Sequence, residues 1–179
     1  MVHVSSSSSQ NPLHNGAGTG FIWDNAGHVV TNHHVIKNSS KLTIRLNTTA
    51  KSDTNTWGKV EKNVEVEAEV VGKDIPKDIA VLRIKEEDRK DLGEKEWRPL
   101  ERGRSRDLKV GQRVFAIGSP FGLERTLTMG IVSGVGRELG GGGRVGRGQP
   151  LFGIIQTDAA ISKYCSLVYL DQEGFFSKG

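Results

Sequence analysis

The sequence has a single cysteine, few aromatic residues and no long apolar run. One cysteine among 179 residues, Cys165, cannot form an internal disulfide, so packing must stabilise the fold. No stretch approaches the roughly 18 apolar residues of a membrane-spanning helix, and residues 1–20 lack the charged start and apolar block of a secretory signal. We therefore expect no membrane span, and the compartment stays unknown.

Neither sign of charge dominates any long segment. Lys and Arg number 25 against 21 Asp and Glu, a net charge of +4, and the two signs are mixed in residues 85–95 and 101–109. No basic stripe is interleaved with aromatic residues, which argues against a nucleic-acid partner. The glycine-rich residues 136–148 lack the following Lys-Ser/Thr of a phosphate-binding loop. We predict no cofactor and no metal.

Short runs with period-two apolar alternation and β-branched residues recur along the chain, and they predict an all-β fold. Turn signals such as Asp24-Asn25-Ala26-Gly27 separate them, and regular spacing favours a barrel or a sandwich. Residues 35–38 and 86–92 are the candidates for a short helix. Residues 48–62 and 136–148 are expected to be surface loops, and the serine run 5–9 a flexible connector, although residues 3–4 could close a first strand. The predicted strands are residues 21–23, 28–31, 41–46, 64–71, 79–84, 113–117, 127–135 and 151–156.

A histidine and an aspartate stand at positions suited to peptide-bond hydrolysis. His34 follows the strand 28–31, and Asp78 lies 44 residues later, directly before the apolar run 79–84. Histidine suits a general base because its unperturbed pKa is near 6.5. Such hydrolysis also requires a nucleophile, a group that orients the base, and donors for the oxyanion.

Four segments together resemble the protease domain of the HtrA/Deg family of trypsin-fold serine endopeptidases. They are GTGFIWDNAGHVVTNHHVI, KDIAVLRI, VGQRVFAIGSPFGLERTLTMGIVSGVGRE and IQTDAAI, in the family's order. The resemblance implies two antiparallel six-stranded β-barrels with the catalytic groups between them, His34 as the base and Asp78 as its orienting acid. We expect residues 1–17 to be a partly flexible N-terminal segment, 18–161 the protease domain, and 162–179 an atypical tail without a PDZ domain.

The nucleophile motif of the family, IQTDAAIN-x-GNSGG, is altered in this chain. Counting five residues from Ile161 leads to Ser166, the only serine in the nucleophile position. Tyr164 and Cys165 replace the preceding Gly and Asn of the motif, and Leu167 and Val168 replace its two following glycines. Because those glycines let the turn present N–H groups to the oxyanion, their loss predicts impaired catalysis. Cys165 as nucleophile is an alternative, but it is one residue out of position.

Two interpretations of the tail remain open. Ser162-Lys163-Tyr164 can be encoded by a sequence containing GTAAGT, the usual start of an intron, so residues 162–179 could be translated intron. The rival is a genuine, diverged end, since Leu170-Asp171-Gln172-Glu173-Gly174 echoes the strand and turn after the family's nucleophile. In either case the second barrel is expected to be incomplete.

The resemblance implies a function and partners. It implies endoproteolysis of unfolded or damaged proteins through an acyl-enzyme, in trimer-based homo-oligomers or hetero-oligomers with related chains, in chloroplast, mitochondrion or periplasm. Six residues before Ser166, Ala160 would form the floor of the primary pocket and favour aliphatic side chains. The alternative function is a non-catalytic pseudoprotease that binds unfolded segments or joins family oligomers.

Overall fold

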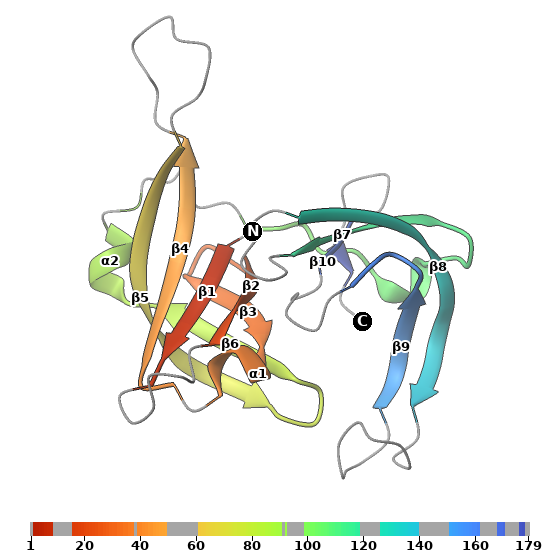
Figure 1. Ribbon diagram of the computed structural model, residues 1–179, viewed down its shortest axis with the longest axis horizontal. Helices are drawn as coiled ribbons and strands as arrows, with labels where there is room; N and C mark the ends of the chain where they lie inside the picture. The colour runs from red at the N-terminus through yellow and green to blue at the C-terminus, as the bar shows by residue number, and fades with distance from the viewer. Residues whose placement is uncertain are drawn as a thin grey trace, which may run out of the picture.

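The computed structural model consists of a closed barrel and a second, open sheet lying beside it (Figure 1). The structure describes residues 2–8, 16–37, 39–49, 61–90, 92, 99–118, 126–139, 151–161, 168–170 and 176–177. The barrel has the strand order β1-β2-β3-β6-β5-β4, and the second sheet has the order β11-β10-β7-β8-β9. The all-β, trypsin-like prediction with an incomplete second barrel is therefore confirmed.

The strands of the barrel are β1 (Val2–Ser7), β2 (Gly16–Ile22), β3 (His28–Asn32), β4 (Lys41–Thr49), β5 (Glu61–Asp74) and β6 (Ile79–Ile84). The second sheet contains β7 (Arg113–Gly118), β8 (Thr126–Leu139), β9 (Leu151–Thr157), β10 (Val168–Leu170) and β11 (Phe176–Ser177). The helical turns are α1 (His33–Ile36), α2 (Glu86–Lys90) and the 3-10 turn η1 (Ser105–Asp107). All strand pairings are antiparallel, and β1 closes the barrel against β4.

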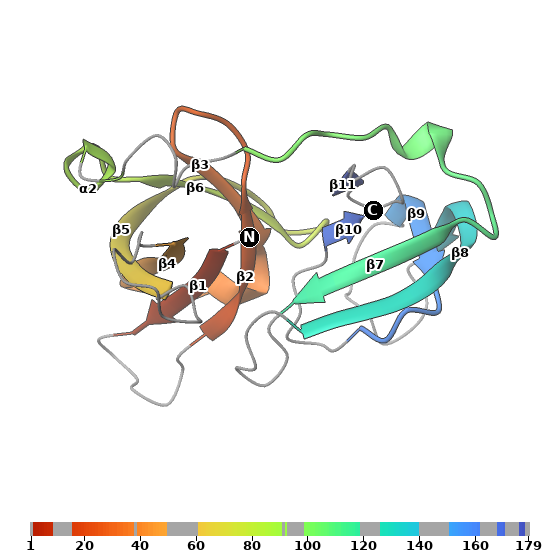
Figure 2. The same cartoon turned by 90° about the horizontal axis from the view of Figure 1, so that it is seen from above.

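The segment around η1 connects the barrel to the second sheet (Figure 2). At its start the Leu100 N–H donates to the Ile22 carbonyl at 3.2 Å. The Arg102 guanidinium lies 4.7 Å from the centre of the Trp23 ring, which is a cation–π distance. The connecting segment is thus fixed to the β2–β3 hairpin where it leaves the barrel. Among the described residues, no helix is long and apolar enough to cross a membrane.

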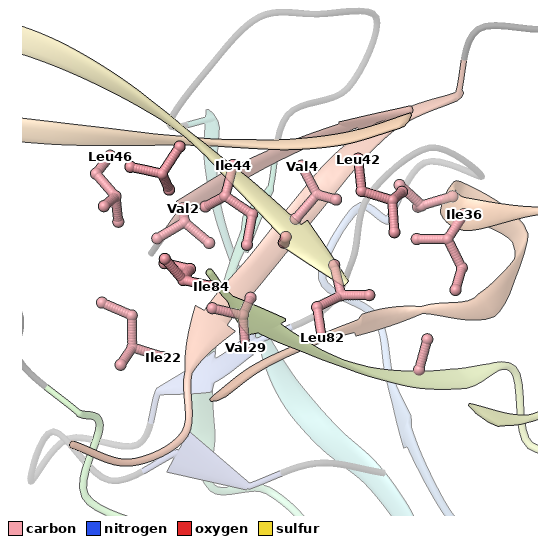
Figure 3. Packing of buried hydrophobic residues seen from close by; sticks show 14 of the residues in the cluster. Val2, Val4, Ile22, Val29, Ile36, Leu42, Ile44, Leu46, Leu82 and Ile84 are labelled. Atoms are coloured by element: carbon pink, nitrogen blue, oxygen red, sulfur yellow. The ribbon is translucent and has the colours of Figure 1, made fainter. Parts of the chain in front are cut away.

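The barrel interior is filled by one cluster of aliphatic side chains, to which all six strands contribute (Figure 3). The alternation that predicted the strands also supplies this core: Ala80, Leu82 and Ile84 of β6 are at most 1% exposed, whereas Arg83 points to solvent. The corresponding cluster of the second sheet is much smaller. It contains Val114, Val132 and Ile155, with Leu108 packed against them.

Three segments expected to lie outside strands belong partly to them. Ser5, Ser6 and Ser7 are in β1, so the prediction of a connector is wrong for these residues. Ladder hydrogen bonds do not depend on side-chain type, and the buried Ser6 hydroxyl donates to the Val35 carbonyl at 2.7 Å. Strand β4 extends through Thr49, β5 begins at Glu61, and β8 extends through Leu139. The remaining residues of the two expected loops, 50–60 and 140–148, lie outside the described part.

Replacing Leu82 with alanine tests the barrel core. The side chain is fully buried, so its truncation leaves a cavity and is expected to lower the free energy of unfolding by roughly 2–5 kcal/mol. Met129→Ala is the matched control, because that side chain is 61% exposed and its loss should change stability by less than about 0.5 kcal/mol. Urea denaturation followed by circular dichroism measures both, and equal effects would contradict the assignment of the core.

Glu67 gives the barrel surface an acid-sensitive contact. Its carboxylate accepts hydrogen bonds from Lys41 and Lys85, which lower the pKa of Glu67 from 4.5 to about 2. A depressed folded-state pKa stabilises the fold above the unfolded value, and this contribution disappears as the pH falls from about 4.5 to 2. Glu67→Gln should therefore flatten the pH dependence of the unfolding midpoint in that window, as measured by thermal denaturation. A variant with the same slope as the parent would show that the contact is not maintained in solution.

Candidate active site

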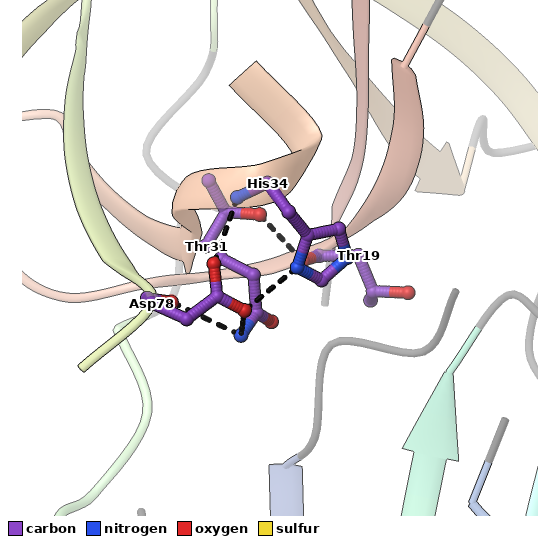
Figure 4. A network of polar contacts seen from close by, with 5 residues as sticks. Thr19, Thr31, His34 and Asp78 are labelled. Carbon is purple, nitrogen blue, oxygen red and sulfur yellow. Dashed lines mark hydrogen bonds and ion pairs between the residues drawn. The ribbon is translucent and has the colours of Figure 1, made fainter. Parts of the chain in front are cut away.

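The turn before β6 and the start of α1 bring His34 and Asp78 together. His34 Nδ1 lies 2.6 Å from Asp78 Oδ2, and the two side chains face each other across the gap between these elements (Figure 4). The backbone N–H of His34 donates to Asp78 Oδ1 at 2.8 Å. One carboxylate thus binds both the ring and the main chain of the same histidine. Both side chains are about two-fifths exposed, so reactants can reach the imidazole.

Asn32 holds Asp78 from a second side. Its amide nitrogen donates to Asp78 Oδ2 at 3.0 Å and to the Asp78 carbonyl at 3.1 Å. The backbone N–H of His33 donates to the same carbonyl at 3.1 Å. Asn32 was not predicted as a site residue. It is the N-cap of α1 but makes no side-chain cap hydrogen bond, and its amide instead binds a partner 46 residues away. His33 contributes its backbone to the site.

Asp78 has a left-handed backbone conformation. Its φ is 53°, the only positive φ at a described residue other than glycine, and Asp is one of the few residues that tolerate this region. The turn is closed by the Asp78 N–H, which donates to the Ile75 carbonyl at 3.1 Å. The five hydrogen bonds that Asp78 accepts from Asn32, His33 and His34 maintain this conformation.

A buried hydrogen bond between β2 and β3 lies next to the site. The Thr31 hydroxyl donates to the Thr19 carbonyl at 2.8 Å, and both threonines are at most 2% exposed. Because Thr31 lies just before Asn32 and His33, this contact fixes the strand end from which α1 begins. The imidazole is therefore attached to a rigid part of the barrel.

A second aspartate–histidine pair lies in the turn between β2 and β3. Asp24 Oδ2 is 2.7 Å from His28 Nδ1, while Asp24 Oδ1 accepts from the backbone N–H groups of Ala26 and His28 at 2.9 and 3.2 Å. Burial raises the pKa of Asp24, but the hydrogen bonds from His28 and Ala26 outweigh it, so the pKa is below its usual value. The two residues are only four positions apart, and their contact stabilises the turn. The pair therefore serves as a comparison for the His34–Asp78 pair.

The predicted nucleophile, Ser166, and its neighbour Cys165 lie outside the described residues. The structure does describe Ala160, whose carbonyl accepts a hydrogen bond from the Thr128 hydroxyl at 2.9 Å, and Asp158, whose Oδ1 accepts from the Ile131 N–H at 2.7 Å. These contacts attach the segment after β9 to β8. Among the described residues, no group of His, Cys, Asp or Glu side chains could hold a metal ion.

Comparison with known proteins agrees with this fold. The model of the trypsin-like peptidase domain matches residues 18–166. "Protease Do-like 1, chloroplastic" of Arabidopsis thaliana is 46% identical over 147 residues, which are 82% of this chain and 28% of that protein. The crystal structure of Deg5 superposes with a TM-score of 0.71 at 35% identity, covering 98% of this chain and 75% of that one. The HtrA-type protease AlgW, solved with a tripeptide, gives a TM-score of 0.70 at 26% identity, covering 98% of this chain and 48% of that one.

A closed barrel beside a second antiparallel sheet, with a histidine–aspartate pair at the end of the barrel, defines the class of trypsin-fold peptidases. The chain belongs to the trypsin-like peptidase domain family, and within it to the HtrA/Deg group of serine proteases. It spans 28% of the length of the curated relative quoted above.

Proposed function

We propose that this chain provides a serine-type endopeptidase domain that acts on unfolded or damaged proteins through an acyl-enzyme, with catalysis impaired by the altered nucleophile motif. The observation that carries the proposal is the 2.6 Å contact between His34 Nδ1 and Asp78 Oδ2. With Asp78 ionised, this contact places the ring proton on Nδ1 and leaves the Nε2 lone pair free. His34 is then able to accept a proton from a nucleophile at Nε2.

The proposed reaction assigns one role to each of three residues. Ser166 Oγ attacks the scissile carbonyl carbon, and its proton passes to His34 Nε2 as the C–O bond forms. Asp78 stabilises the resulting imidazolium and fixes its orientation. His34 then gives the proton to the leaving amine as the C–N bond breaks, and a water molecule, activated by His34 in the same way, hydrolyses the ester. Ser166 is assigned the role of nucleophile from its sequence position alone.

The alternative function is a pseudoprotease that binds unfolded segments or joins oligomers of related chains. It is favoured by Tyr164, Cys165, Leu167 and Val168, which replace the residues that shape the oxyanion turn in the family's motif. Loss of a single oxyanion donor lowers the rate of a working protease by roughly 10² to 10³. Both functions predict assembly with related chains, in trimers or larger oligomers. The chloroplast is the proposed compartment, because the name of the Arabidopsis relative describes that protein as chloroplastic.

A serine-directed phosphonate separates the two functions. Under the peptidase proposal, the purified chain should be labelled at Ser166, with slow cleavage of casein, and both signals should disappear in Ser166→Ala. Mass spectrometry of the labelled peptide identifies the modified residue, and gel electrophoresis follows casein. Intact casein and an unlabelled chain that still exchanges with related oligomers would support the pseudoprotease instead. Labelling at Cys165 would reassign the nucleophile.

A further inference from the structure

A buried serine connects strand β1 to the helix that carries His34. Ser6 is 4% exposed, and its hydroxyl donates to the Val35 carbonyl of α1 at 2.7 Å. The same oxygen accepts the backbone N–H of Gly16, the first residue of β2, at 3.2 Å. One hydroxyl group therefore joins β1, β2 and the residue that directly follows His34.

Helix α1 depends on contacts from outside itself. A helix leaves its first four N–H groups and its last four carbonyls without intrahelical partners, and α1 has only four residues. The two N–H groups at its start bind Asp78. At its end, Ser39 donates to the Ile36 carbonyl from both its N–H and its hydroxyl, at 3.3 and 2.8 Å. The Val35 carbonyl receives its donor from Ser6.

The packing around the Ser6 hydroxyl leaves no room for an added atom. A Cβ at Gly16 would overlap the Val35 carbonyl oxygen and would lie 2.6 Å from Ser6 Oγ. A Cβ at Gly18 would lie 2.5 Å from Val35 Cγ2, and the Val35 side chain is 1% exposed within the barrel core. Both the carbonyl and the side chain of Val35 are thus held in one position.

The position of Val35 determines the position of the neighbouring imidazole. Because consecutive Cα atoms are a fixed distance apart, a displacement of Val35 moves the backbone of His34 with it. The His34 ring projects from α1 toward Asp78 (Figure 4), and Nδ1 lies 2.6 Å from Oδ2. Hydrogen bonds weaken steeply when their geometry departs from linear, so a small shift of α1 is sufficient to weaken this contact.

We propose that Ser6 is a positioning residue for His34. By donating to the Val35 carbonyl, it holds α1 where the imidazole meets Asp78. The consequence for proteolysis rests on the proposed function, in which His34 is the general base. The positioning itself does not, because it can be measured on the imidazole of a chain that cleaves nothing.

Ser6→Ala removes the donor from the buried Val35 carbonyl, which is then stabilised by moving toward another donor. At about pH 9, where imidazoles are neutral, ¹⁵N NMR measures the ratio of the Nδ1–H to the Nε2–H tautomer of His34. This ratio should fall at least about threefold, because a weakened contact with Asp78 no longer favours the proton on Nδ1. The ratio at His28, whose Nδ1 contacts a different carboxylate, should not change.

Ser5→Ala is the matched control for this variant. It removes the same hydroxyl group from the neighbouring residue of β1, where that hydroxyl donates to the Thr43 carbonyl of β4 at 3.4 Å. The tautomer ratio of His34 should therefore stay at the value of the parent chain. Circular dichroism verifies that both variants are folded.

A second pair of variants adds a methyl group. Gly16→Ala places a Cβ where it overlaps the Val35 oxygen, and it should lower the His34 ratio at least as far as Ser6→Ala does. Gly72→Ala, in β5, places its Cβ in open space and should leave the ratio unchanged. Should Gly16→Ala fail to fold, Ser6→Ala, which adds no atom, decides the question by itself.

Three results would overturn the proposal. The first is an unchanged His34 ratio in folded Ser6→Ala, and the second is an equal fall at His34 and His28, which would give Ser6 a role in general stability only. The third is a Ser6→Ala chain that the serine-directed phosphonate labels at the parental rate. A parent chain that is not labelled at Ser166 contradicts the proposed peptidase function instead, and the tautomer ratio, which needs no nucleophile, then decides the role of Ser6.

Discussion

Restoring the GNSGG part of the family's nucleophile motif is expected to raise casein cleavage by at least about 10²-fold. The change consists of Tyr164→Gly, Cys165→Asn, Leu167→Gly and Val168→Gly around an unchanged Ser166. Glycine gives the turn the freedom to aim its N–H groups at the oxyanion, and one restored donor is worth roughly 10² to 10³ in rate. Initial rates with fluorescently labelled casein measure the effect.

Two further variants control this experiment. The chain with all four substitutions, here called the repaired chain, should return to the background rate when Ser166→Ala is added, which excludes a contaminating protease. Val168 is the first residue of β10 and pairs with Ile117, so a version that retains Val168 tests whether glycine there weakens the strand. If a folded repaired chain cleaves no faster than its parent, the four replaced residues do not account for the impairment.

Replacing Asp78 with asparagine in the repaired chain should lower kcat by roughly 10⁴-fold, the size of effect seen when the acid of such a triad becomes an amide. Asp78 accepts hydrogen bonds from both the backbone N–H and the ring of His34. An amide offers only one accepting oxygen, so its NH₂ group replaces one of the two oxygens that face His34. When the NH₂ group faces Nδ1, the imidazole carries its proton on Nε2, and Nε2 then cannot accept the proton of Ser166.

The Asp24–His28 pair supplies a matched control for this substitution. Its Nδ1–Oδ2 distance of 2.7 Å is close to that of the candidate site, but it lies in the β2–β3 turn. Asp24→Asn in the repaired chain should leave kcat unchanged, and ¹⁵N NMR of the imidazoles should show a changed tautomer at His34 only in the Asp78 variant. Equal losses of kcat from the two substitutions would indicate a general effect on folding.

Strand positions could be predicted from the sequence where a strand has one buried face. In β6, strict alternation places Ala80, Leu82 and Ile84 inside, and the predicted bounds are those observed. Burial does not follow the alternation where the register changes. Val70 and Val71 lie in a strand as predicted, but both side chains are exposed at the point where β5 shifts its pairing with β6, between Val70 and Gly72. A bulge of this kind depends on the partner strand and leaves no local signal.

The candidate site was predicted in part. His34 and Asp78 were found by their family motifs, and the structure brings them into contact. The contribution of Asn32 was not predicted, because its partner lies 46 residues away and only the pairing of β3 with β6 brings them together. The extent of β1 was missed for a related reason, since three serines carry little strand propensity and gain their place by pairing with β2 and β4.

The positive φ of Asp78 couples the backbone conformation of this turn to the contacts that orient His34. Glycine adopts that backbone conformation without steric cost, whereas a side chain there costs of order 1–3 kcal/mol unless neighbouring groups compensate for it. At Asp78 the carboxylate supplies that compensation through its hydrogen bonds with Asn32 and His34. Any substitution that removes the carboxylate therefore loses these bonds together with the orientation of His34, and only glycine would also remove the backbone strain.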